Sequence, residues 1–415
     1  MRLKLVVGAL LVSLTMFPAG ADPAGPAETL PPSVPVGFVI TPAAVSLTAT
    51  SLAFTPSGDA LYVTTLLGRV LRFPVVAGLI AGPPSTFLTG LNQPLGVLAT
   101  DDTVFIADSV PGTPRALGIV LRARDGDGDG AAESVETVIS GLPNGRHNTN
   151  GMAFGADGML YITNGNSTDS GFGAEGGEPE VRPYSGSVVR VDPAATDLTP
   201  APEMVVATGF RNIYDIAFFP DGHPAATPGT MKAAVPMNGP DGQTYGNVTR
   251  PAGEDTLNIF DAATGSVEHF GFPWCLYDRA NGGLAGFTQD ASEGSCDPLP
   301  AEASSGLPAP VVQAFPDALF GLHVSADGLA FNPNTSFPAA YDHDLFVADF
   351  GNFFGTVPVG HKVVRVRFDS SGAVTAVEDF LTGILPLDLT FAPDGALWIA
   401  DTTGIILRVA GILPR

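Results

Sequence analysis

A run of acidic residues at alternate positions carries the clearest metal-binding pattern in this chain. Asp125, Asp127 and Asp129 alternate with glycines, and Glu136 follows seven residues after Asp129. The run matches D-x-D-x-D-G-x5-E, in which carboxylates at positions 1, 3, 5 and 12 and the backbone carbonyl of position 7, here Ala131, surround one hard cation. The sequence therefore predicts a calcium site built from these five residues.

The segments on both sides of this loop have the composition of β-strands. Residues 118–122 and 135–139 are rich in valine and isoleucine and lack a helical period. We therefore expect a structural calcium loop within a hairpin, not a paired EF-hand. The alternative is a solvated acidic loop that holds no ion.

A second set of polar residues could carry out acid–base chemistry. His147, the pair Arg211-Asn212, and His323 each precede an apolar segment that belongs to a repeat described below. A histidine can act as a general base near neutral pH. If the repeats are equivalent, these side chains meet at one end of a channel. The alternative for each is an ordinary hydrogen-bonding role in a loop.

The remaining histidines point to structure more than to chemistry. His223, His343 and His361 lie in turn-like or charged surroundings and are predicted at the surface. His269 stands beside the aromatic run 270–274, which could form the wall of a pocket or anchor a long insertion, and the anchor is favoured for His269 itself. No GxSxG, HExxH, Walker or GxGxxG motif supports serine hydrolysis, a zinc protease or a nucleotide site.

A phrase of apolar residues, a turn and a second apolar run recurs six times. Several turns read Pro-Asp-Gly, in which proline presets φ and glycine accepts a positive φ, so each copy favours a hairpin. Three or four strands per copy, repeated at roughly 40 to 65 residues, predict an all-β, six-bladed β-propeller forming a single closed domain over residues 37–415. Two β-sandwich domains are the alternative. The copies begin at Ser51, Leu95, Gly151, Asp215, Gly328 and Asp388.

The start of the chain is expected to direct export. Residues 1–21 have a basic start, an apolar stretch and an A-x-A site, so they are predicted to be a signal peptide cleaved after Ala21. A Pro-rich lead-in follows at 22–36, and residues 36–40 are expected to pair with the last blade. We predict a periplasmic or secreted protein without a membrane span, in which Cys275 and Cys296 form a disulfide.

The net charge of −23 argues against nucleic acid and anionic membranes as partners and is compatible with calcium.

Taken in order, several of these pieces resemble the soluble quinoprotein glucose/sorbosone dehydrogenase family. Members of that family are six-bladed propellers that bind pyrroloquinoline quinone (PQQ) and calcium. The resemblance implies a dehydrogenase that oxidises an aldose or related polyol and passes electrons to an acceptor that the sequence does not identify. The matching pieces are the Asp125–Gly130 loop, His147 with 153–158, 209–212, 270–275, 328–331 and 360–366.

The resemblance also assigns roles to single residues. His147 would accept the hydroxyl proton as hydride passes to the quinone, and Arg211 and Asn212 would contact cofactor and substrate. Lys362 would contact the quinone carboxylates, and His323 is expected at the same cofactor. Fixed cations suit a tricarboxylate, because arginine offers it two parallel hydrogen bonds.

One part of the chain departs from the family pattern. The family has arginine before its last Pro-Asp-Gly repeat, whereas the loop 382–388 contains no cation here and ends in Asp388. A second hypothesis is therefore a calcium-stabilised propeller that has lost the quinone and binds a carbohydrate or protein. A third is a metal-dependent hydrolase or lactonase of the six-bladed type.

Overall fold

The computed structural model describes most of the chain as β-structure. Three short 3-10 helices, Pro202–Met204, Ala301–Ser304 and Ala339–Tyr341, are the only helices in this described part, and none is long and apolar enough to cross a membrane. The predicted signal peptide lies outside it. The described residues are 31–45, 48–112, 115–171, 180–240, 242, 244–245, 248–249, 252–278, 283–287, 293–295, 299, 301–307, 310–352 and 358–412.

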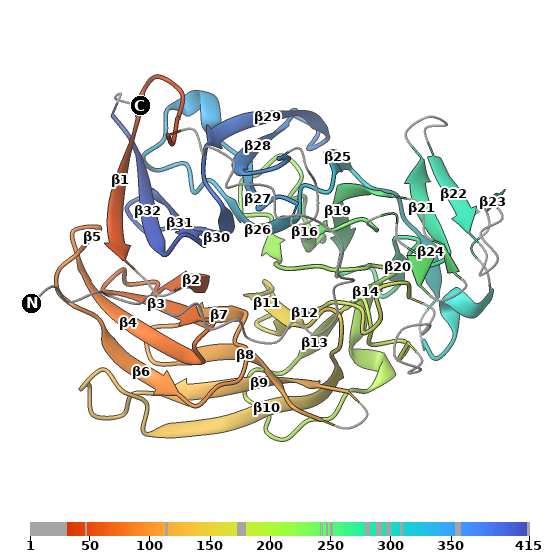
Figure 1. Ribbon diagram of the computed structural model, residues 1–415, viewed down its shortest axis with the longest axis horizontal. Helices are drawn as coiled ribbons and strands as arrows, with labels where there is room; N and C mark the ends of the chain where they lie inside the picture. The colour runs from red at the N-terminus through yellow and green to blue at the C-terminus, as the bar shows by residue number, and fades with distance from the viewer. Residues whose placement is uncertain are drawn as a thin grey trace, which may run out of the picture.

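Six sheets of four or more strands are arranged around a common axis, as in a β-propeller (Figure 1). In each of them the first strand lies beside this axis, and the next three strands follow in antiparallel order. The sheets are β2(Ala49–Phe54)-β3(Ala60–Thr65)-β4(Arg69–Val76)-β5(Leu79–Ile80) with β6(Ser85–Thr89) on β4; β7(Gly96–Ala99)-β8(Val104–Val110)-β9(Leu117–Arg124)-β10(Ser134–Pro143); β11(Thr149–Phe154)-β12(Leu160–Asn164)-β13(Ser187–Val191)-β14(Val205–Thr208); β15(Ala217–Phe218)-β16(Lys232–Met237)-β19(Glu254–Asp261)-β25(Ala318–Leu322); β26(Ala326–Phe331)-β27(Leu345–Asp349)-β28(Lys362–Phe368)-β29(Val374–Thr382); and β30(Pro386–Phe391)-β31(Leu397–Asp401)-β32(Ile405–Gly411)-β1(Phe38–Val45).

The hydrophobic core is divided among the interfaces between neighbouring sheets. One buried cluster joins Leu61 of β3 to Trp398 of β31, so the first and last sheets pack against each other. Five further clusters join the other successive pairs. Because each sheet is apolar on both faces, its strands carry nearly continuous apolar runs.

The turns form for the reason that the sequence suggested. Gly158 has a φ of +74° and Gly395 a φ of +81°, a region that glycine enters without steric cost. These turns connect the first and second strands of their sheets. The start of each first strand therefore lies at the opposite end of the axis, where His147 and Arg211 are.

The predicted pairing of the N-terminal segment with the last sheet is confirmed. β1 runs antiparallel to β32, from Phe38 opposite Gly411 to Val45 opposite Ile405. Phe38 is buried, and its ring packs edge-on against Phe337 and Phe380. The first and last strands of the described chain are thus joined within one sheet.

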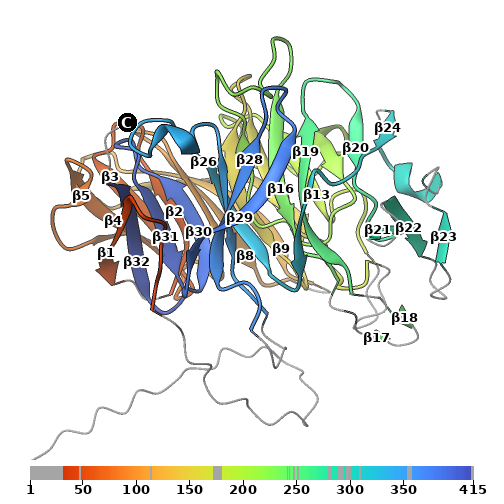
Figure 2. The same ribbon diagram turned by 90° about the horizontal axis from the view of Figure 1, so that it is seen from above.

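The long insertion between the fourth and fifth copies extends the third sheet. β20(Val267–His269) pairs in parallel with β14, and β24(Val311–Gln313) pairs with β20. Smaller sheets, β17(Thr244–Tyr245)-β18(Val248–Thr249) and β21(Cys275–Asp278)-β22(Gly283–Phe287)-β23(Glu293–Ser295), lie at the margin of the molecule (Figure 2). Cys275 is buried at the start of β21, but Cys296 lies outside the described residues, so their disulfide stays a prediction.

Candidate functional site

Backbone hydrogen bonds bring three loop segments together at one end of the propeller axis. The His147 N–H donates to the Asn166 carbonyl at 3.2 Å, and the Asn166 N–H donates to the Arg211 carbonyl at 2.7 Å. His147 precedes β11, Asn166 follows β12, and Arg211 lies ahead of β15. The structure thus places His147, Asn166 and Arg211 in one cluster, the His147 corner.

The side chain of His147 is oriented by Asn166. Its Nδ1 lies 2.6 Å from Asn166 Oδ1, which can only accept a hydrogen bond, so Nδ1 carries the proton and Nε2 keeps a free lone pair. Burial, and then the cation of Arg211, lower the pKa of His147 to about 3. The imidazole is therefore neutral near pH 7, which is the form that a general base requires.

Arg211 is held by an ion pair that the sequence did not reveal. Its guanidinium contacts the carboxylate of Asp169, and both side chains are buried. Arg211 also donates to the carbonyl of Gly239 at 3.0 Å, and Arg146 Nε lies 3.7 Å from Asp169 Oδ2. Asp169 therefore compensates part of the positive charge of Arg211.

Asn212 belongs to a ladder of amide side chains that crosses sheets. Its Nδ2 donates to Asn238 Oδ1 at 2.7 Å, and its Oδ1 accepts from Asn150 Nδ2 at 3.4 Å. Asn238 in turn donates to the carbonyl of Ala326 at 2.8 Å. Asn212 thus helps to fix the loops of the third, fourth and fifth sheets.

Positive charge exceeds negative charge in this corner, within the part of the chain that the structure describes. Arg115 donates to Ser167 at 2.6 Å, so it lies beside the Asn166 segment. The corner contains four arginines, Arg115, Arg146, Arg182 and Arg211, and two carboxylates, Asp169 and Glu180. In a protein of net charge −23, this local excess fits an anionic ligand such as a carboxylate-bearing cofactor.

The other two predicted cofactor contacts belong to the fifth sheet. His323 precedes β26 in a left-handed conformation, with a φ of +61°. Lys362 begins β28, and its Nζ lies 2.6 Å from Asp379. The hydrogen bonds of the described residues do not join either side chain to His147 or Arg211.

Two acidic residues beside the axis, Asp215 and Asp388, were not identified from the sequence as buried contacts between sheets. Asp388 Oδ2 accepts the Leu52 N–H at 2.8 Å, and Asp215 Oδ2 accepts the Leu329 N–H at 3.2 Å. Burial raises the pKa of Asp388 to about 6 and that of Asp215 well above its usual range, and the charge of Asp388 raises the pKa of Asp215 further. Asp388 therefore connects the sixth sheet to the first, and it is a buried residue of β30, not a loop residue.

Tyr214, which lies near these two acids, links two sheets across the axis. Its hydroxyl donates to the Thr50 carbonyl at 2.8 Å, from the fourth sheet to the first, and the side chain is buried. The sequence did contain a signal for these contacts: Asp215 and Asp388 occupy the repeat position that is glycine in the third and fifth copies, Gly151 and Gly328. Gly151 and Gly328 leave the space: a Cβ on either would collide with Asp215 or Asp388.

The acidic loop is a hairpin turn, as predicted, but its fourth carboxylate differs. Asp125, Asp127, Asp129 and Glu133 place one oxygen each within 4.8 Å of one another, between β9 and β10. Glu136 instead lies within β10 opposite Arg122 and pairs with its guanidinium at 2.6 Å. The acids that lie together in the loop thus include Glu133 and not Glu136, and calcium binding by any of them stays a prediction. The predicted role of the Ala131 carbonyl stays a prediction.

The surface assignment of His223 was wrong. The side chain is 2% exposed, and its ring packs at 4.7 Å from Phe219 and 4.8 Å from Phe368. Nδ1 accepts the Ala225 N–H, so Nε2 donates to the His343 carbonyl at 2.9 Å. Burial lowers the pKa of His223 to about 4, as expected for a neutral core histidine. His343 and His361 are partly exposed.

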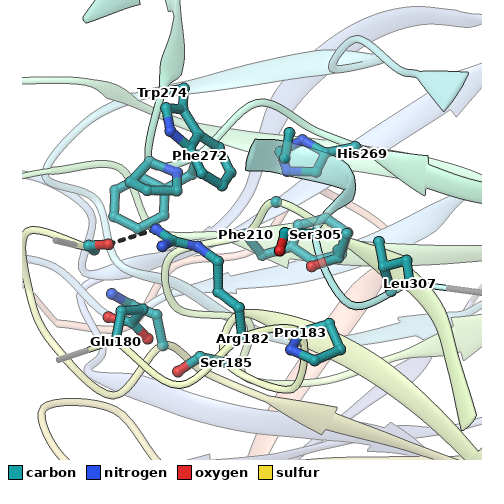
Figure 3. Close-up of a pocket in the computed structure, with 16 residues that line it drawn as sticks. Glu180, Arg182, Pro183, Ser185, Phe210, His269, Phe272, Trp274, Ser305 and Leu307 are labelled. Carbon is teal, nitrogen blue, oxygen red and sulfur yellow. Dashed lines mark hydrogen bonds between the residues drawn. The ribbon is translucent and has the colours of Figure 1, made fainter. Parts of the chain in front are cut away.

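A cavity adjoins the His147 corner on the side of the insertion (Figure 3). Arg182, His269, Phe272 and Trp274 line it, and Asn166 forms part of its wall. The sequence left two roles open for this aromatic run, the wall of a pocket or an anchor for the insertion, and Phe272 and Trp274 lie in the wall of the cavity.

Sequence comparisons leave the family of this chain open. A family model described as "Domain of unknown function (DUF7133)" matches residues 83–211. An uncharacterized protein of Borreliella burgdorferi is 27% identical over 214 residues, which are 49% of this chain. The chain thus spans about half (47%) of the length of this curated relative.

Structural comparisons identify the fold. The holo PQQ domain of a pyranose dehydrogenase from Coprinopsis cinerea matches with a TM-score of 0.68 at 16% sequence identity. A calcium structure of a Trichoderma reesei carbohydrate-active enzyme of family AA12 matches with a TM-score of 0.65, also at 16% identity. Each alignment covers 92% of this chain and 97% of the other chain. The apo soluble aldose sugar dehydrogenase of Escherichia coli has a TM-score of 0.61 at 18% identity, covering 90% and 99%. At these identities the similarity shows the fold alone: this chain has the propeller fold found in sugar dehydrogenases.

Proposed function

We propose that this protein is an exported PQQ- and calcium-dependent dehydrogenase that oxidises the alcohol or anomeric carbon of an aldose or related polyol. The observation that carries the proposal is the neutral imidazole of His147, fixed by Asn166 at 2.6 Å beside a corner where arginines outnumber carboxylates. The sugar dehydrogenase folds found among solved structures support the same reading.

His147 would act as the general base. Its Nε2 accepts the proton of the substrate hydroxyl, while the carbon transfers a hydride. The substrate therefore loses two electrons and two protons in total, one proton to His147 and the other within the hydride. PQQ, when bound, would supply the acceptor for that hydride. Arg211 and Asn212 would orient cofactor and substrate, with His323 and Lys362 approaching from the fifth sheet.

The residues present fit an anionic cofactor in part. Arg115, Arg146 and Arg211 can hold carboxylates, because guanidinium groups offer paired donors to them. Glu133 and the aspartates of the acidic loop would hold calcium away from the reacting atoms, where the ion stabilises the β9–β10 hairpin.

We further propose that all six sheets are blades of one closed domain. The first strands contact one another in the cycle β2, β7, β11, β15, β26, β30 and back to β2, and β1 completes the last sheet. Export would follow from cleavage after Ala21, with the Cys275–Cys296 disulfide formed outside the cytoplasm.

The second candidate is a propeller that binds a carbohydrate or protein without a quinone. Two observations favour it: Asp169 compensates Arg211, and the loop 382–388 brings only the internal Asp388. Such a protein would show affinity without turnover.

The deciding experiment is a titration of the mature, calcium-loaded protein with PQQ, followed by reduction of an artificial dye with a panel of sugars. We expect saturable PQQ binding and sugar-dependent dye reduction. Absence of PQQ binding at high cofactor concentration would exclude the dehydrogenase in favour of the binding propeller. Ring opening of a lactone without any electron acceptor would instead indicate a hydrolase.

A further inference from the structure

The cavity beside the His147 corner is small and polar at one end. Its volume is about 20 Å³, which is room for one or two water-sized groups. A whole sugar ring does not fit, whereas a single carboxylate does. Arg182, His269 and Trp274 face one another around it (Figure 3).

Arg182 brings a cation to this cavity, and no residue that the structure describes forms an ion pair with it. Its guanidinium lies over the Trp274 ring at 4.3 Å, and Nη2 donates to the Gly171 carbonyl at 2.7 Å. Among the described residues no carboxylate lies within 4.0 Å of it. A partly buried guanidinium whose other N–H groups face a cavity favours an anionic acceptor.

His269 adds a second donor, for which the described part of the chain provides no acceptor. Its Nδ1 accepts the Gly271 N–H at 3.0 Å, so the proton is on Nε2. The side chain is 2% exposed, and no described residue accepts a hydrogen bond from Nε2. Burial, and then Arg182, lower the pKa of His269 to about 3, which keeps this donor neutral.

The nearby acid is engaged elsewhere. Glu180 accepts hydrogen bonds from the backbone N–H groups of Ser167 at 2.9 Å and Thr168 at 3.0 Å, and from both hydroxyls of these residues. Its carboxylate therefore caps the 167–168 turn. Glu180 also lines the cavity, but its two oxygens already accept these four hydrogen bonds, so Arg182 and His269 remain as the donors that can bind a carboxylate there.

We propose that this cavity binds the carboxylate of an acidic sugar, a uronate, whose ring extends toward the His147 corner. Asn166 connects the two places, because it lines the cavity and its Oδ1 bonds His147 Nδ1 at 2.6 Å. The assignment of the uronate as substrate rests on the proposed function; its binding does not.

The test is calorimetric titration of the mature protein, without quinone, by glucuronate and by glucose at low salt. We expect saturable glucuronate binding and at least about ten-fold weaker glucose binding, the factor of one charge-assisted hydrogen bond. Arg182→Gln should weaken glucuronate binding by about ten-fold or more. The matched control is Arg190→Gln, which removes an outer-strand arginine paired with Asp157 at 2.8 Å. Equal binding of both sugars, or full affinity in R182Q, would overturn the proposal.

Two further variants keep the test decisive if R182Q does not fold. Arg182→Lys keeps the charge but loses the planar pair of donors, so it should weaken glucuronate binding less than the loss of the cation would. His269→Phe removes the Nε2 donor and should weaken binding several-fold. Wild-type affinity in both variants would refute the site.

The result also separates this inference from the dehydrogenase proposal. Glucuronate binding that depends on Arg182, without PQQ-dependent dye reduction, would confirm the cavity and reject the dehydrogenase. Dye reduction with neutral sugars, without glucuronate binding, would confirm the dehydrogenase and reject the cavity.

Discussion

The imidazole of His147 donates from Nδ1 to Asn166, so its environment fixes both its tautomer and its charge. A free histidine loses half its base form near pH 6.5, but burial and Arg211 lower the pKa of His147 to about 3. The base form of His147 therefore persists as the pH falls well below 6.5.

We accordingly expect the sugar-dependent rate to stay constant from pH 7 down to about pH 5 and His147→Ala to lower kcat by about 10²- to 10⁴-fold. Dye reduction across this pH range measures both effects. Asn166→Asp, which keeps the acceptor but adds a charge, should raise the apparent pKa. A fall in wild-type rate centred near pH 6.5 would contradict the assignment.

We expect Asp388 to make the stability of the folded protein depend on pH. Its pKa is raised by burial from 3.8 to about 6, so the folded protein binds this proton more tightly than the unfolded chain. The resulting stabilisation is full below about pH 4 and is lost as the pH rises to about 6. Asp215, which interacts with it, shifts in the same direction.

Melting temperatures of wild type and Asp388→Asn, measured from pH 4 to 7, test this directly. We expect the advantage of the wild type over D388N to shrink as the pH rises. Asp221→Asn, in an exposed turn, should give a curve parallel to the wild type. Parallel curves for D388N as well would show that Asp388 does not titrate in this range.

At the scale of the element, the β9–β10 register decides which acids lie together in the loop and could hold the proposed calcium ion. β10 begins at Ser134, so Glu136 faces Arg122 across the ladder, while Glu133 remains in the loop and accepts the Gly126 N–H at 2.5 Å. The spacing pattern of a helical calcium loop therefore does not transfer to this hairpin.

We expect calcium to raise the melting temperature and chelation to lower it, by about 2.7 kcal/mol of stability at a hundred-fold excess over Kd. Asp127→Asn and Glu133→Gln should weaken the response of the melting temperature to calcium. Glu136→Gln should keep that response although it breaks the Arg122 pair. Loss of the calcium response in E136Q alone would restore the twelfth-position assignment.

At the scale of the whole molecule, β1 joins the two ends of the chain. Because the last sheet takes its outer strand from the N-terminus, its loss exposes β32 and the apolar residues packed around Phe38. The stability of the last sheet therefore depends on residues far away in the sequence.

Phe38→Ala should lower the free energy of unfolding by about 3–5 kcal/mol, the usual cost of removing a buried phenylalanine. Removal of residues 22–45 should destabilise the fold further. Denaturant unfolding measures both, and Val39→Ala, at an exposed position of the same strand, is the control. An unchanged midpoint in either of the first two variants would show that β1 does not hold the ring.

Much of the fold could be predicted because its signals are local. The turn glycines, the β-rich runs and their recurrence defined the strands, and the predicted pairing of residues 36–40 with the last sheet was confirmed by β1 and β32. The insertion strands β20 and β24 were not foreseen, since the edge that they extend is formed by β14, about 60 residues earlier.

The sequence by itself determined which residue types lie at this end of the propeller axis. His147 and the Arg211-Asn212 pair were identified because each precedes the first strand of a repeat. Tertiary structure alone decided their state. Asp169 pairs with Arg211, Asn166 sets the tautomer of His147, and sheets two positions apart bring Asp215 within range of Asp388. These partners come from separate loops, and burial, which sets their pKa values, exists only when the sheets assemble.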